Sequence, residues 1–240
     1  MKVLSIGNSF SQDAQRNLHA LAKHNRIAIR AVNLYIGGCS LRTHYLNMLE
    51  NNDAYTYEFN GESTGLRVSI SQVLASDDWD VVTLQQASHL SARYETYQPY
   101  ANELAAHIRK YCPRAKLMIH ETWAYEEGSE RLLTVGKFES ATAMHAAIRD
   151  AYEKTAKDIG AYGIIPCGDA MIHAAVEGGL TIHRDSFHAS FGIGRYLLSL
   201  CWLRALTGAD ISEDSFMPLD APITDDERRI IIRAVNETAR

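Results

Sequence analysis

The chain has 240 residues, of which 46% are hydrophobic and 22% charged, a composition typical of an ordinary globular protein. Its 24 Lys and Arg against 29 Asp and Glu give a net charge of −5, which argues against a protein that mainly neutralises nucleic-acid phosphates. No apolar run reaches the roughly 18 residues that span a bilayer, and the N-terminus lacks the features of a signal peptide. We therefore expect a cytoplasmic protein with neither a nucleic-acid nor a membrane partner.

Short apolar runs alternate with stretches of helical periodicity along the chain. The runs predict strands at residues 3–6, 27–35, 80–84, 116–119 and 163–166. The periodic stretches predict helices over residues 12–25, 97–111, 138–159, 189–207 and 225–238. This alternation is typical of an α/β fold with a mostly parallel sheet, here of five strands.

Two segments interrupt the alternation. Residues 53–71 alternate aromatic and polar side chains around Asn60-Gly61, which predicts a hairpin inserted between the second and third strands. Residues 123–137 read as a long polar loop, of the kind that often lies over an active face. With no repeat and no low-complexity linker, we expect a single domain over residues 1–240.

Metal and cofactor motifs are absent from the sequence. No His-x-x-x-His spacing occurs among the ten histidines, and no Cys-x-x-Cys spacing occurs among the four cysteines. Gly192-Ile193-Gly194 opens like a dinucleotide fingerprint, but Leu197 fills the third glycine position. We therefore expect reduced cysteines, no metal and no organic cofactor.

The first strand ends in Gly7-Asn8-Ser9-Phe10-Ser11, a strand-to-helix turn that exposes a serine. Backbone N–H groups and the helix dipole at such a turn favour a developing oxyanion, so Ser9 is a candidate nucleophile. The alternative is an ordinary helix cap, a common role of serine.

Asp185 and His188, three residues apart near the C-terminal end, form the second candidate motif. A carboxylate at this spacing accepts a hydrogen bond from Nδ1 and leaves Nε2 free to take a proton from a serine. A plain surface turn with this spacing also occurs by chance.

Together, the two motifs resemble those of the SGNH (GDSL-type) hydrolase superfamily. Gly7-Asn8-Ser9 stands in the place of its nucleophile block, Gly38 in that of its oxyanion glycine, and Asp185 to His188 in that of its last block. The resemblance covers essentially the whole chain and implies a flavodoxin-like, three-layer α/β/α sandwich. It also implies a triad of Ser9, His188 and Asp185, with no cofactor.

The sequence departs from the superfamily pattern at two blocks. Asn8 replaces the Asp that usually precedes the nucleophile. Gln85-Gln86 stands where the third block usually carries an asparagine oxyanion donor. A glutamine amide donates the same N–H, and we favour Gln86 over Gln85 because a small residue follows it. The expected oxyanion hole is then Ser9, Gly38 and Gln86.

We expect the partner to be a small-molecule or carbohydrate ester. Trp123, His120 and Tyr94 follow strands on the expected active face and are candidate substrate contacts, although a loop tryptophan packed on the core is an equal alternative. The favoured function is a serine esterase that removes a short acyl group, such as acetyl, from a carbohydrate. The alternatives are a lipase, thioesterase or arylesterase with the same triad, and a non-catalytic glycan-binding module.

Overall fold

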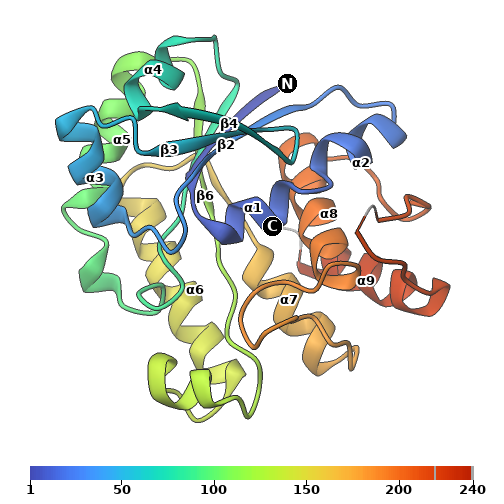
Figure 1. Cartoon of the computed structure of the whole chain (residues 1–240). Helices are drawn as coiled ribbons and strands as arrows, with labels where there is room; N and C mark the ends of the chain where they lie inside the picture. The colour runs from blue at the N-terminus through green and yellow to red at the C-terminus, as the bar shows by residue number, and fades with distance from the viewer. Residues whose placement is uncertain (219, 239–240) are drawn as a thin grey trace.

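The computed structural model describes residues 1–218 and 220–238, and in this part of the chain seven strands form one sheet (Figure 1). The order across the sheet is β4-β3-β2-β1-β5-β6-β7. The strands are β1 (Lys2–Gly7), β2 (Arg30–Tyr35), β3 (Tyr55–Phe59), β4 (Glu62–Val68), β5 (Val81–Leu84), β6 (Lys116–His120) and β7 (Gly163–Ile165).

Five neighbouring strands of this sheet, β2, β1, β5, β6 and β7, are parallel, as the sequence predicts. β2 and β5 lie on opposite sides of β1, so the strand order reverses at β1. Ligands of open α/β sheets bind at the carboxyl ends of strands at such a reversal. The expected sheet of five strands is nevertheless too small, because the hairpin β3-β4 pairs antiparallel with β2 and extends the sheet.

Helices cover both faces of the sheet, which confirms the three-layer α/β/α architecture (Figure 1). Val3 and Leu4 are adjacent in β1 but belong to separate cores, because successive strand residues point to opposite faces. One core includes α3 (Leu41–Glu50), α4 (Ile70–Ala75), α5 (Tyr100–Tyr111) and α6 (Ala141–Asp158). The other includes α1 (Ser9–Gln15), α2 (Leu18–His24), α7 (Cys167–Val176), α8 (Ile193–Thr207) and α9 (Asp225–Thr238).

Within the described ranges, no helix combines the length and apolar character needed to cross a bilayer. Two shorter helical segments lie in the loops that follow β5 and β6. They are a 3₁₀ turn at Tyr94–Thr96 and a π-helical turn at Leu132–Gly136.

The expected single helix over residues 12–25 is wrong, because two short helices, α1 and α2, replace it. α1 begins earlier than expected, at Ser9, since Asn8 and Ser11 form a reciprocal capping box that satisfies backbone N–H groups of the first turn. The tip of the hairpin β3-β4 contacts the segment between these two helices, where Arg16 Nη1 donates to the Gly61 carbonyl at 3.0 Å.

Gly61→Ala tests this close approach. The backbone of Gly61 has a φ of +86°, and an added Cβ would lie 2.3 Å from the carbonyl oxygen of Arg16. We expect the variant to lose about 2–4 kcal/mol of unfolding free energy in urea denaturation, from left-handed strain plus the clash. Gly65→Ala is the matched control, since Gly65 has a φ of +76° and a Cβ added there would meet nothing within 4 Å. Equal losses in the two variants would rule out the packing contact.

Candidate active site

A serine, a histidine and an aspartate form a hydrogen-bonded chain at the carboxyl end of β1. Ser9 Oγ lies 2.9 Å from His188 Nε2, and His188 Nδ1 lies 2.8 Å from Asp185 Oδ2. A carboxylate can only accept, so Nδ1 carries the ring proton and the Nε2 lone pair accepts the Ser9 hydroxyl. Partial burial raises the pKa of Asp185, but hydrogen bonds from the ring and backbone of His188 outweigh it, and the pKa lies below its ordinary value. The structure thus joins the two sequence motifs.

Ser9 and His188 line a cavity of about 420 Å³. Its other lining residues are Asn8, Phe10, Tyr35, Gly37, Gly38, Ser88, His89, Tyr125, Arg131, Val135 and Phe187.

Two backbone N–H groups beside the cavity are candidates for an oxyanion hole. Ser9 is the first residue of α1, and Gly38 lies in a turn with a φ of +63°. Neither N–H has an acceptor among the residues that the structure describes. Both residues line the cavity, which makes these two N–H groups the candidate donors to a ligand there.

Asn8 fixes the turn that carries Ser9. Its Oδ1 accepts from the Phe10 backbone N–H at 3.0 Å and from Gln85 Nε2 at 2.7 Å, and its Nδ2 donates to the Cys39 carbonyl at 3.0 Å. Gln85 Oε1 in turn accepts from His120 Nδ1 at 2.6 Å. Both ends of the Gln85 amide are therefore used inside the protein, and Gln85 positions the nucleophile turn.

The structure does not bring the Gln86 amide to the cavity either. Its Oε1 accepts from the Leu41 and Ala87 backbone N–H groups, each at 2.9 Å, and its Nε2 lies 3.2 Å from two oxygens of Thr96. Gln86 is fully buried and ties the start of α3 to the 3₁₀ turn. The third oxyanion donor expected from the sequence is thus missing from this geometry, because tertiary contacts occupy both glutamines.

The three candidate substrate contacts also lie outside the cavity lining. Trp123 is fully buried, stacks on Phe10 with ring centroids 4.0 Å apart, and donates from Nε1 to the Phe187 carbonyl at 2.8 Å. It therefore braces the neighbours of Ser9 and His188. His120 is buried beneath Gln85, and the Tyr94 hydroxyl bonds Asp158 at 2.5 Å.

Burial lowers the pKa of His120 to about 3, so the folded protein holds the ring neutral while the unfolded chain protonates near pH 6.5. This stabilising contribution is complete above pH 6.5 and is lost as the pH falls toward 3. We expect the unfolding free energy of the wild type, relative to His120→Gln, to fall by about 1–2 kcal/mol between pH 7 and pH 5 in urea denaturation. A pH-independent difference would contradict a neutral buried ring.

A buried carboxylate that the sequence analysis missed, Asp13, holds the loop that carries His188 against α1. Asp13 accepts from Arg184 and Arg195, each at 2.8 Å, and from the Ala189 backbone N–H at 3.2 Å. Arg184 precedes Asp185 and Ala189 follows His188, so Asp13 fixes both flanks of the loop. No local pattern marks this role, because the partners lie more than 170 residues away in the sequence.

Asp13→Asn is expected to lower the unfolding free energy by about 3–5 kcal/mol, because it leaves two guanidinium groups without their buried partner. Chemical denaturation measures this change. Asp78→Asn is the control, since both side chains of the Asp78–Arg114 pair are at least 80% exposed and the pair should contribute at most about 1 kcal/mol. A loss in Asp13→Asn as small as in the control would show that the buried network does not hold the loop.

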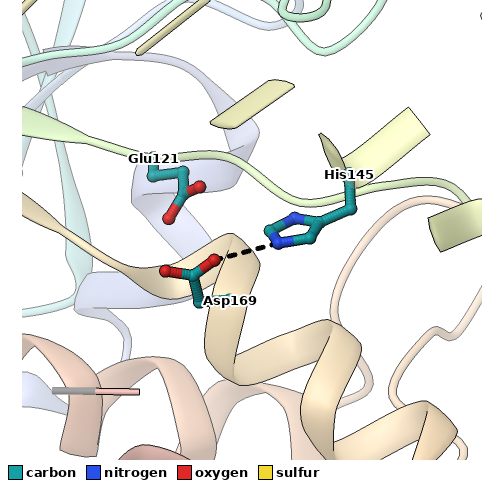
Figure 2. Close-up of side chains that lie close together, drawn as sticks. All are labelled: Glu121, His145 and Asp169. Carbon is teal, nitrogen blue, oxygen red and sulfur yellow. Dashed lines mark hydrogen bonds and ion pairs between the residues drawn. The ribbon is translucent and has the colours of Figure 1, made fainter. Parts of the chain in front are cut away.

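Figure 2 shows a separate cluster in which Glu121, His145 and Asp169 point toward one another. His145 Nε2 lies 2.9 Å from Asp169 Oδ1, and the three potential ligand atoms lie within 4.8 Å of one another. An imidazole with two carboxylates could hold a divalent cation. Arg149 lies 3.8 Å from Asp169, however, so the chain itself supplies positive charge there. The cluster does not contribute to the cavity beside Ser9.

Comparison with solved structures identifies the class of fold. A protein from Slackia heliotrinireducens, described as a candidate SGNH hydrolase, is 26% identical, with a TM-score of 0.63 over 86% of this chain and 98% of that chain. A family 3 carbohydrate esterase from Clostridium thermocellum is 13% identical, with a TM-score of 0.51 over 85% of this chain and 94% of that chain, and shares the fold. The expected SGNH-hydrolase fold is therefore confirmed.

Two further comparisons identify the family to which the chain belongs. A family model described as a domain of unknown function (DUF4886) matches residues 2–231. A DUF4886 family protein from Bacteroides uniformis is 35% identical, with a TM-score of 0.90 over 99% of this chain and 93% of that chain. This chain belongs to the DUF4886 family. No curated protein matches it.

Proposed function

We propose that this protein is a serine esterase in which Ser9 is the nucleophile, His188 the general base and Asp185 the residue that orients His188. The observation that carries the proposal is the continuous chain of hydrogen bonds from Ser9 Oγ through both ring nitrogens of His188 to Asp185. The shared fold with SGNH hydrolases supports this assignment of roles.

The reaction follows from these contacts. Ser9 Oγ attacks the ester carbonyl as its proton passes to His188 Nε2, and Asp185 stabilises the imidazolium. The backbone N–H groups of Ser9 and Gly38 donate to the tetrahedral oxyanion. His188 then protonates the departing alcohol, and water, deprotonated by His188, releases the acid and restores Ser9.

The substrate in this proposal is a short acyl ester, most simply an acetyl ester of a carbohydrate. A cavity of about 420 Å³ is adequate for a small acyl group with one ring of the alcohol. Tyr35, Tyr125 and Phe187 line it, and aromatic faces of this kind suit packing against a ring. A lipase or thioesterase would instead need room for a long chain.

Ser9→Ala tests the proposal through hydrolysis of an aryl acetate. We expect the rate to fall by roughly 10³-fold or more, because the alanine cannot form the acyl-enzyme. Ser71→Ala is the matched control: Ser71 Oγ lies 3.1 Å from His107 Nε2, a serine–histidine pair remote from the cavity, and its loss should leave the rate unchanged.

Full activity of Ser9→Ala would refute the nucleophile assignment. A wild type that binds esters without hydrolysing them would favour the glycan-binding alternative. Esters from acetate to octanoate then distinguish the acyl length, and a rate that rises with chain length would point to a lipase or thioesterase.

A further inference from the structure

Arg131 lines the cavity and carries a positive charge, but it has no role in the proposed esterase mechanism. It lines the same cavity as Ser9, and its guanidinium carbon lies 3.6 Å from the centre of the Phe187 ring and 5.3 Å from that of Tyr125. The side chain makes no hydrogen bond or ion pair with any residue that the structure describes, and its Nε is buried. By contrast, both arginines beneath the site have acidic partners: Arg184 pairs with Asp13, and Arg195 pairs with Asp13 and Asp220.

The remaining cavity wall does not offset this charge. None of its described lining residues is an aspartate or a glutamate. His89 also lines the cavity, but burial, together with the charges of Arg93 and Arg131, lowers the pKa of His89 and favours the neutral ring. The formal charge that faces a ligand is therefore positive.

The contacts with Phe187 and Tyr125 hold the Arg131 guanidinium in place. It is therefore suited to bind a ligand, unlike a charge on a mobile surface side chain. A guanidinium stacked on a ring keeps its planar edge of N–H donors in one orientation, and this edge matches a carboxylate or phosphate. A polar group left buried without a partner is costly, so a bound anion would satisfy donors that the protein leaves open.

We propose that Arg131 forms an anion-binding subsite beside Ser9, and that the preferred substrate is an ester that carries a negative charge. The negative group is a carboxylate, sulfate or phosphate on the acyl or the alcohol side. This inference rests on the proposed esterase function, because it names the substrate class of the same cavity.

Two pairs of esters test the subsite by kinetics. In one pair, 4-acetoxybenzoate and its methyl ester, the charge is on the alcohol side; in the other, 4-nitrophenyl hemisuccinate and 4-nitrophenyl butyrate, it is on the acyl side. We expect the ratio of kcat/KM for the charged over the neutral ester to fall roughly 10–100-fold in Arg131→Gln for at least one pair. Arg131→Lys should retain part of this ratio, since it keeps the charge but loses the planar donors.

Arg233→Gln is the matched control. It removes the same charge from an exposed residue of α9 outside the cavity lining, and the ratio should change less than about twofold. Ratios in Arg131→Gln that equal those of the control, with hydrolysis still dependent on Ser9, would overturn the subsite and leave the esterase intact.

A binding measurement makes the test independent of turnover. In the Ser9→Ala protein, calorimetric titration should show 4-acetoxybenzoate binding at least about tenfold more tightly than its methyl ester, and Arg131→Gln in that background should remove the difference. If the wild type hydrolyses no ester but this difference is present, the esterase proposal fails and the subsite stands. Equal or undetectable binding of both probes, with unchanged kinetic ratios, would reject the subsite.

Discussion

The buried carboxylate of Asp13 is the contact on which the site geometry depends. It lies one turn after Ser9 in α1 and binds Arg184 and the Ala189 backbone N–H, on either side of His188 in its loop, and Arg195 at the start of α8. Separating a buried carboxylate from its arginines is costly, because each charge would then lie in the protein interior without a partner. This geometry therefore brings a helix from the start of the chain and a loop from its last quarter within hydrogen-bond distance of each other.

Other supports of the site come from the ends of neighbouring strands. The segment after β5 provides Gln85, which holds Asn8, and the segment after β6 provides Trp123, which packs against Phe10 and bonds the Phe187 carbonyl. Because these strands are parallel, their carboxyl ends meet at one edge of the sheet. Gln85 and Trp123, which looked like an oxyanion donor and a substrate contact in the sequence, thus support the turn of Ser9 and the loop of His188.

The arginines beneath the site and the arginine in the cavity wall differ in whether an acidic residue pairs with them. Beneath the site, arginines are paired with Asp13, so their charges hold the chain together and are unavailable to a ligand. At the wall, the Arg131 guanidinium lies over the rings of Phe187 and Tyr125, and its side chain makes no hydrogen bond or ion pair within the described residues. In our proposal, the chain therefore combines a serine–histidine–aspartate site with a substrate preference set by one side chain of the cavity wall.

The sequence alone determined the α/β class and the parallel strands, because hydrophobic periodicity is a local property. Its short motifs, with the superfamily resemblance that they carry, also singled out Ser9, Gly38, Asp185 and His188 as candidate site residues. Tertiary structure decided that the hairpin joins the sheet, that both glutamines bond inward, and that Trp123 is buried. It also decided that Asp13 pairs with Arg184 and Arg195, and that the Arg131 guanidinium lies over the Phe187 ring in the cavity wall. These outcomes depend on contacts between residues far apart in the chain, which no local pattern encodes.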